Sequence, residues 1–190
     1  MKLRQIVWIL IILSLVFGCQ KKQEAEKKVD AATSEKQQIV TISSITPFSY
    51  VCLPHTGSYE NHETIISSLM EAAAAQGFEL VGPMLGIYYN SPTDTPADSL
   101  IWEIGFEVPD SMEVADPLVV KKWTFTKVAK AMHTGPYETV AETYPKVFEF
   151  IGKMNLMPAG PTMERFLSDP LVVAPEEIET EIWVPVSGGQ

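Results

Sequence analysis

The chain has 190 residues, a formal net charge of −10 and a sequence pI near 4.7. From residue 39 onward, 20 Asp and Glu stand against seven Lys and Arg, so the acidic balance belongs to the body of the chain. This charge argues against a nucleic-acid partner, because a phosphate backbone is bound by a basic surface. The body has roughly 150 residues, enough for one domain with its own core.

The first 18 residues have the pattern of an export signal. Two basic residues precede an apolar run over 6–17, which is too short to span a bilayer. The run ends at Gly18-Cys19, which resembles the lipobox of bacterial lipoproteins, where cleavage before the Cys leaves a thiol for acylation. We therefore expect 1–18 to be a lipoprotein signal peptide and Cys19 to be the lipidation site. The alternative is an ordinary signal peptide or a weak membrane anchor.

Residues 19–38 are expected to be a disordered tether between the membrane and the domain. They hold mainly Lys, Glu, Gln, Ala and Ser, with one Val and no aromatic residue. Such a segment buries too little apolar surface to offset the entropy of ordering. Gln20 stands where some lipoproteins carry the Asp that retains them in the inner membrane, so the outer membrane is favoured in a Gram-negative cell. The expected location is the cell envelope, with the domain outside the cytoplasm.

The first half of the body, about 39–109, predicts a strand, a helix and two further strands. Its β-branched and aromatic residues favour strands, with a break at Pro47, and Gly77 is a natural end for the helix. The expected elements are an extended stretch at 39–56, a helix at 61–76 and strands at 85–89 and 100–108.

The second half, about 118–186, predicts the same order of elements after a connecting loop at 109–117. Pro145 is compatible with its helix only in the first turn, where no backbone hydrogen bond is lost. The expected elements are an extended stretch at 119–133, a helix at 143–155 and strands at 162–167 and 177–186. Each half is therefore a β-α-β-β unit.

The two halves are similar in sequence at one constant offset. HTGSYE at 55–60 returns as HTGPYE at 133–138, which is 78 positions later (133 − 55 = 78). The same offset carries the Gly-Pro at 82–83 onto the Gly-Pro at 160–161. We expect an α+β fold for 39–190, built as a tandem repeat with pseudo-two-fold symmetry. It should have a central antiparallel sheet, two helices on one side and a ligand cleft on the other.

Strand alternation assigns the side chains of the later strands to faces of the sheet. Glu103 and Glu181 occupy equivalent positions, and both should point away from the helices. Glu164 and Phe166 share one face in the second half. Their counterparts in the first half are Gly86 and Tyr88. A glutamate on one side and a glycine on the other is the asymmetry expected if one wall of a duplicated cleft has specialised.

The order of motifs resembles the GyrI-like small-molecule-binding family, which includes the effector-binding domains of some bacterial transcription regulators. The resemblance covers about 40–186. It rests on HTGPYE at 133–138, Gly-Pro at 160–161, Glu-Arg-Phe at 164–166 and TEIWVPV at 180–186. It implies a cleft between the halves in which a glutamate and aromatic side chains hold lipophilic, often cationic molecules.

The resemblance and the symmetry between the halves together name the candidate ligand-binding residues. They are Glu164, Tyr59, Tyr137, Tyr88, Phe166, Glu181, Trp183 and Glu103. Each also has a structural interpretation. A glutamate on an exposed strand is usually solvated, a duplicated tyrosine can hold a strand-to-helix corner, and a half-buried tryptophan can simply pack. Two symmetric histidines, His55 and His133, are better explained by local turn bonding than by a metal site.

We expect a membrane-anchored protein that binds a small amphipathic molecule, cationic or neutral, without a cofactor or a metal ion. A binding protein is favoured over an enzyme, because the chain has no Ser-His-Asp or Cys-His signature. One alternative is a hydrolase of reactive small electrophiles, with Glu164 and Tyr137 as its acid-base pair. The other alternative is a protein-interaction module of the envelope.

Overall fold

The computed structural model describes residues 40–189. The predicted signal peptide over 1–18, the acylated Cys19 and the tether at 19–38 lie outside the described residues. No helix in the described part of the chain is both long enough and apolar enough to cross a bilayer.

The described residues form one antiparallel sheet and two α-helices, as the halves of the sequence predicted. The strands are β1 (Thr41–Ser44), β2 (Phe48–Thr56), β3 (Met84–Tyr88), β4 (Ile101–Val108), β5 (Val119–Trp123), β6 (Lys127–Thr134), β7 (Leu156–Pro158), β8 (Thr162–Phe166) and β9 (Glu179–Gly188). The helices are α2 (His62–Ala75) and α3 (Tyr144–Lys153), and short 3₁₀ turns occur at Tyr59–Asn61, Ala97–Ser99, Tyr137–Glu142 and Pro175–Glu177.

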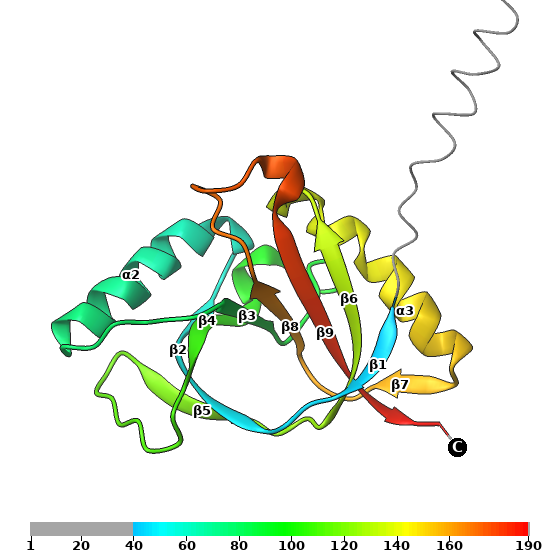
Figure 1. Ribbon diagram of the computed structural model, residues 1–190, viewed down its shortest axis with the longest axis horizontal. Helices are drawn as coiled ribbons and strands as arrows, with labels where there is room; N and C mark the ends of the chain where they lie inside the picture. Colours follow the sequence, from blue (N-terminus) through cyan, green and yellow to red (C-terminus); the bar gives the residue numbers. More distant parts are fainter. Residues whose placement is uncertain (1–39, 190) are drawn as a thin grey trace, which may run out of the picture. The chain divides into compact units, whose positions relative to one another are not determined.

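The strands follow the order β1-β6-β9-β8-β3-β4-β2-β5, and β7 pairs with β9 outside this path. β3 and β8 form the central pair, with α2 and α3 to either side of it (Figure 1). In that pair Gly86 lies directly opposite Glu164, its own counterpart at the 78-residue offset. The pseudo-two-fold axis therefore passes between these two residues, and the predicted pseudo-symmetric α+β fold is confirmed.

The two halves exchange their first strands, which the sequence did not predict. The extended stretches expected at 39–56 and 119–133 each divide into two strands. β1 leaves its own half and pairs with β6, and β5 pairs in the same way with β2. The two pairings have equivalent registers. Thr41 is paired with Lys130, and Val119, the counterpart of Thr41 at the 78-residue offset, is paired with Cys52, the counterpart of Lys130. Each half therefore supplies an edge strand to the other.

Each helix packs its apolar face on the strands of its own half. α2 buries Leu69 and Ala73 in a cluster with residues of β2 and β4, and α3 buries Val147 and Ile151 in a cluster with β6 and β9. Burial of an aliphatic side chain of this size contributes about 1.5–3 kcal/mol. α3 has Pro in its first turn, as expected.

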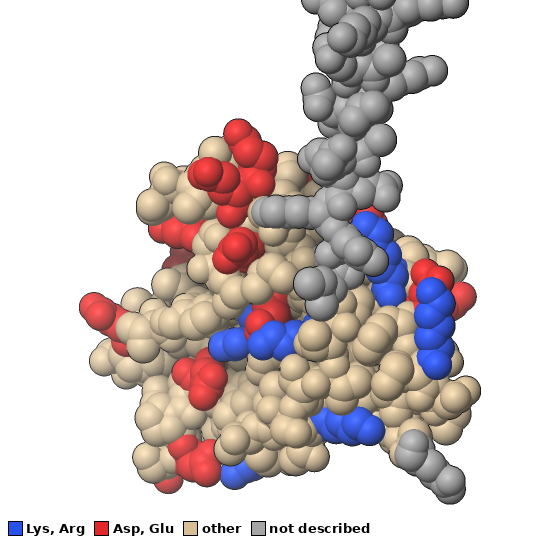
Figure 2. Space-filling model, turned by 45° about the vertical axis from the view of Figure 1, so that its right-hand side comes forward, with Lys and Arg blue, Asp and Glu red and all other residues tan. Residues whose placement is uncertain are grey.

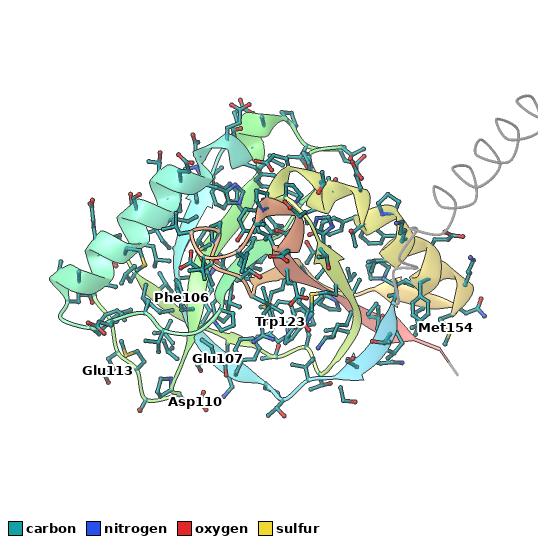
Figure 3. The ribbon with its side chains drawn as sticks, turned by 45° about the horizontal axis from the view of Figure 1, so that its top comes forward. Phe106, Glu107, Asp110, Glu113, Trp123 and Met154 are labelled. Carbon is teal, nitrogen blue, oxygen red and sulfur yellow. The ribbon has the colours of Figure 1, made fainter. Side chains whose placement is uncertain are left out.

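The sheet face away from the helices carries a hydrophobic cluster of its own. Its buried members are Tyr50, Cys52, Leu85, Ile87, Trp123, Val128, Met163 and Trp183. Figure 3 shows Trp123 in the middle of the body, whereas Asp110 and Glu113 lie at its edge. The sequence placed the ligand cleft on this face. The structure instead fills the face with apolar side chains, and the candidate acid lies on the other face.

Candidate functional site

Glu164 lies on the face of the sheet that the helices cover. On one side it is paired with Ile182 of β9, a core residue beneath α3. On the other side it is paired with Gly86 of β3, and Gly86 is paired in turn with Ile104 of β4, which belongs to the core beneath α2. Residues paired in this way point to the same side of a sheet. Glu164 is 9% exposed. A glutamate on the central strand pair, between the two helices, is thus largely removed from water.

Two tyrosine hydroxyls donate hydrogen bonds to this carboxylate. Tyr144, the first residue of α3, donates to Oε1 at 2.7 Å, and Tyr88 of β3 donates to Oε2 at 3.2 Å. Burial raises the pKa of Glu164, and the hydrogen bonds from the two tyrosines offset only part of this increase. No ion pair among residues 40–189 includes Glu164. The carboxylate therefore has neutral donors and no cationic partner within the described chain.

Gly86 makes the hydrogen bond from Tyr88 possible. A Cβ placed on Gly86 would lie 2.6 Å from the Tyr88 hydroxyl oxygen and 2.9 Å from its Cζ. Because no side chain is there, the Tyr88 ring folds back over the position and its hydroxyl reaches Glu164 on the neighbouring strand. The glycine and the glutamate on the axis thus act together: one leaves the space and the other supplies the charge.

Aromatic rings of the first half surround Tyr88. Tyr59 contacts it edge-on with ring centroids 5.1 Å apart, and Trp102 lies behind Tyr59 at 5.8 Å. His62, the first residue of α2, lies 4.3 Å from the Trp102 ring, and its Nε2 is 3.1 Å from the Tyr88 hydroxyl. We call Glu164, Tyr88, Tyr144, Tyr59 and His62 the Glu164 cluster.

The second half repeats part of this arrangement with Tyr137 and Phe166, whose rings meet edge-on at 5.4 Å. The Tyr137 hydroxyl donates to the carbonyl of Ser168 at 3.3 Å, just as that of Tyr59 donates to the carbonyl of Asn90 at 2.9 Å. Both tyrosines therefore anchor the loop after a central strand, which differs from the strand-to-helix corner that their structural interpretation named. The Tyr59 ring also contacts the ring of Tyr88, and the Tyr137 ring contacts the ring of Phe166.

Sequence reasoning paired Glu164 with Tyr137, but the structure gives the hydrogen bonds to Tyr144 and Tyr88. Tyr144 and His62 were not among the candidate residues. Each is the first residue of its helix, where the backbone leads from a 3₁₀ turn into the α-helix. A polar aromatic residue at the start of a helix beside a central strand was the signal available in the sequence.

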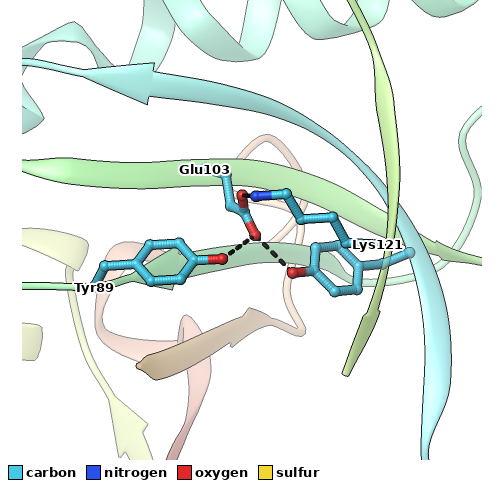
Figure 4. A network of polar contacts seen from close by, with 4 residues as sticks. Tyr89, Glu103 and Lys121 are labelled. Carbon is cyan, nitrogen blue, oxygen red and sulfur yellow. Dashed lines mark hydrogen bonds and ion pairs between the residues drawn. The ribbon is translucent and has the colours of Figure 1, made fainter. Parts of the chain in front are cut away.

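Glu103 belongs to a different site on the far face of the sheet. It is 1% exposed, and Oε1 accepts hydrogen bonds from Tyr50 at 2.6 Å and from Tyr89 at 2.9 Å. Its other oxygen forms an ion pair with Lys121 of β5 (Figure 4). The carboxylate is thus neutralised by a cation within the chain, which is the pattern of a structural ion pair.

Glu181 is neutralised in the same way on the same face. Lys130 lies 2.6 Å from Oε1, while Arg165 at 3.0 Å and the indole nitrogen of Trp183 at 2.7 Å donate to Oε2. Burial acts to raise the pKa of Glu181, but these donors outweigh it and lower the pKa. Basic side chains lie next to acidic ones on the face shown in Figure 2.

The eight predicted residues therefore form two groups. Glu164, Tyr88, Phe166, Tyr59 and Tyr137 lie together on the helix-covered face. Glu103, Glu181 and Trp183 lie on the other face, within ion pairs and the apolar cluster. Within residues 40–189, no group of three or more His, Cys, Asp or Glu side chains could hold a metal ion.

The chain belongs to the GyrI-like small-molecule-binding family, whose model matches residues 39–187. The family resemblance inferred from the motifs is thereby confirmed. A comparison with curated protein sequences gives no match.

Solved structures with the same fold include three that are informative. A hydrolase from Listeria innocua is 16% identical, with a TM-score of 0.62 over 85% of this chain and 98% of that one. The C-terminal domain of EcmrR is 14% identical, with a TM-score of 0.67 over 80% and 98%. SAV2435 bound to tetraphenylphosphonium is 14% identical, with a TM-score of 0.51 over 79% and 94%. At these identities the likeness establishes the fold alone.

Proposed function

We propose that the Glu164 cluster binds a small amphipathic cation. The observation that carries this proposal is a carboxylate, 9% exposed, with hydrogen bonds from Tyr144 and Tyr88 and no ion pair in the described chain. An ionised group in such a place is costly unless a charge of opposite sign approaches it. A cation would supply that charge, and aromatic rings favour cations over their faces.

The two other buried carboxylates support the same interpretation by contrast. Glu103 and Glu181 each have a lysine partner, and Glu181 has an arginine as well. Glu164 is the buried carboxylate of residues 40–189 that lacks an intramolecular cation. SAV2435, which shares the fold, is bound to tetraphenylphosphonium, a lipophilic cation.

Glu164→Gln is expected to weaken the binding of tetraphenylphosphonium by about 1–3 kcal/mol, the order of the attraction between two unit charges several ångströms apart near a protein surface. Glutamine preserves the shape. Its amide oxygen can accept from one tyrosine and its NH2 group can donate to the hydroxyl oxygen of the other, so the change removes the charge and reverses one hydrogen bond. Isothermal titration calorimetry measures the difference.

Glu149→Gln is the matched control, because it removes the same charge from the exposed Glu149–Lys153 pair on α3. We expect the control to bind as the wild type does. An equal loss of affinity in both variants would mean that only net charge matters, and no loss in Glu164→Gln would reject the proposed role.

Hydrolysis of a reactive small electrophile is the second candidate function. Two tyrosine hydroxyls on a buried carboxylate of raised pKa have the composition of an acid-base group, and one of the proteins with this fold is a hydrolase. Mass spectrometry of a strained-ring electrophile incubated with the protein decides this candidate. Turnover that persists in Glu164→Gln would exclude Glu164 as its acid-base residue.

We also propose that Cys19 is acylated and holds the domain outside the cytoplasm, with the outer membrane favoured in a Gram-negative cell. The support is the apolar run before Gly18-Cys19. Cys19→Ser is expected to move most of the protein from the membrane fraction to the soluble fraction, because an acyl chain contributes about 0.8 kcal/mol per buried methylene. Cell fractionation with immunoblotting measures this, and unchanged membrane retention would contradict acylation at this residue.

A further inference from the structure

His62 is linked to Glu164 through a single oxygen atom. Its Nε2 lies 3.1 Å from the Tyr88 hydroxyl, and that same hydroxyl lies 3.2 Å from Glu164 Oε2. The other ring nitrogen, Nδ1, is hydrogen-bonded to the main-chain carbonyl of Tyr59. One phenol therefore stands between an imidazole and a carboxylate.

The hydrogen atoms in this chain of contacts can be counted. A carbonyl only accepts, so Nδ1 of His62 must carry a hydrogen in order to bond to Tyr59. In a neutral imidazole the other nitrogen, Nε2, then has none and is an acceptor. The Tyr88 hydroxyl has one hydrogen and faces two acceptors, Nε2 and the ionised carboxylate. When both groups are deprotonated, one of these contacts lacks a hydrogen.

One added proton completes both contacts, and it can do so in two ways. In the first, Glu164 is protonated and donates to the Tyr88 oxygen, while Tyr88 donates to Nε2. In the second, the proton is on Nε2 of His62, which donates to Tyr88, while Tyr88 donates to the ionised Glu164. The two forms differ by the transfer of one hydrogen along each contact. The proton consequently belongs to the pair and not to one residue.

The surroundings bring the two groups closer in proton affinity. Burial lowers the pKa of His62. The hydrogen bond to the Tyr59 carbonyl partly opposes this shift, and the nearby His55 adds to it. Burial has the opposite effect on Glu164 and raises its pKa. The ionisable groups around the pair are His55 on β2, Tyr59 in the first 3₁₀ turn, Tyr88 on β3 and Tyr144 on α3. Neither residue takes part in an ion pair within residues 40–189.

We propose that His62 is a positioning residue of the ligand site, which acts through Tyr88 to set the pH at which Glu164 becomes available to a cation. This inference rests on the proposed function of the Glu164 cluster. A proton held by the pair competes with a cation for the carboxylate. Binding of a permanently charged ligand must therefore weaken as the pH falls through the pKa of the pair.

The sign of the effect of His62 follows from the same count. Without an imidazole, Tyr88 donates to Glu164 and the ionised state has all its hydrogen bonds. The carboxylate then holds a proton less strongly, and the decline in affinity moves to a lower pH. The pH profile responds to this role, whereas a merely structural histidine would change affinity equally at every pH.

The experiment compares tetraphenylphosphonium binding near pH 8 and near pH 5 by calorimetry. In the wild type, affinity should fall about tenfold per pH unit below the pKa of the pair, as one linked proton requires. In His62→Phe, the ratio of the two affinities should be smaller by at least threefold, a size set by a shift of about half a pKa unit or more. His55→Phe is the control, since His55 also contacts the Trp102 ring but lies outside the hydrogen-bonded path from His62 through Tyr88 to Glu164. Because His55 lowers the pKa of His62, its removal should not move the decline in affinity to a lower pH.

A second variant and a ligand-free measurement keep the test decisive. If His62→Phe does not fold, His62→Gln replaces it. The glutamine amide can donate to the Tyr88 oxygen, so the hydrogen of the Tyr88 hydroxyl remains available for the bond to Glu164. NMR titration of the His62 ring should give a lower midpoint in Glu164→Gln than in the wild type. An unchanged midpoint together with an unchanged affinity ratio overturns the inference. Absence of tetraphenylphosphonium binding at every pH overturns the proposed function instead, and the NMR result then decides this inference alone.

Discussion

Lys121→Met is expected to lower the free energy of unfolding by about 1–3 kcal/mol, because it leaves the buried Glu103 carboxylate without its cation although Lys121 itself is partly exposed. The carboxylate of its partner Glu103 is 1% exposed and would lose the one cation that pairs with it among residues 40–189, keeping hydrogen bonds from Tyr50 and Tyr89. Methionine retains most of the apolar stem, so the loss is mainly electrostatic. Urea denaturation followed by fluorescence measures it.

Lys122→Met is the matched control for this prediction. Lys122 is the next residue in β5, and its ion pair with Asp110 is exposed on both sides. The control should change stability by no more than about 1 kcal/mol. A double variant in which Glu103 is also replaced by leucine should recover much of the loss, because the unpaired charge is then absent. Equal effects of the two single variants would contradict a special role for the Glu103 pair.

Gly86→Ala is expected to destabilise the fold by about 1–3 kcal/mol, as over-packing in a core does. The same change should weaken tetraphenylphosphonium binding, because the new methyl group would lie 2.6 Å from the Tyr88 hydroxyl and displace it from Glu164. Chemical denaturation and calorimetry measure the two effects separately. The second effect tests whether the orientation of Tyr88 matters to the ligand.

Gly152→Ala provides a comparison at an open site. Gly152 lies in α3, and a Cβ there would meet nothing within 4 Å. Alanine is favoured over glycine inside a helix by roughly 0.5–1 kcal/mol, so this variant should be as stable as the wild type or more so. If Gly86→Ala matched it in stability and in binding, the close approach of Tyr88 to Gly86 would not explain the site.

Much of the fold could be predicted from the sequence, because strand alternation is a local pattern and the 78-residue offset is found by comparing the chain with itself. The exchange of first strands between the halves could not be predicted. The break at Pro47 within the extended stretch 39–56 was predicted, but nothing in the composition says which half of the sheet the residues before it join. That choice depends on contacts far apart along the chain, such as Thr41 with Lys130.

The candidate site was predicted in part. Alternation placed Glu164 with Phe166 on one face, and placed Glu103 with Glu181 on the face away from the helices, as the structure has them. The face of Glu164 relative to the helices was predicted wrongly, because the cleft was expected opposite the helices and β8, with polar and apolar residues on both sides, gives no signal of its own. Tyr144 was missed because its contact with Glu164 depends on the residue at which α3 begins and on the orientation of that helix on the sheet.

The position of Glu164 on the symmetry axis bears on how a binding domain of this kind can arise. In an assembly of two identical β-α-β-β chains, the residue at this position would meet a copy of itself across the axis. Two glutamates would repel one another, and two glycines would leave the centre without charge. Two unlike halves, here joined in one polypeptide, are needed to place one negative charge, with a glycine opposite, at the middle of an otherwise symmetric scaffold.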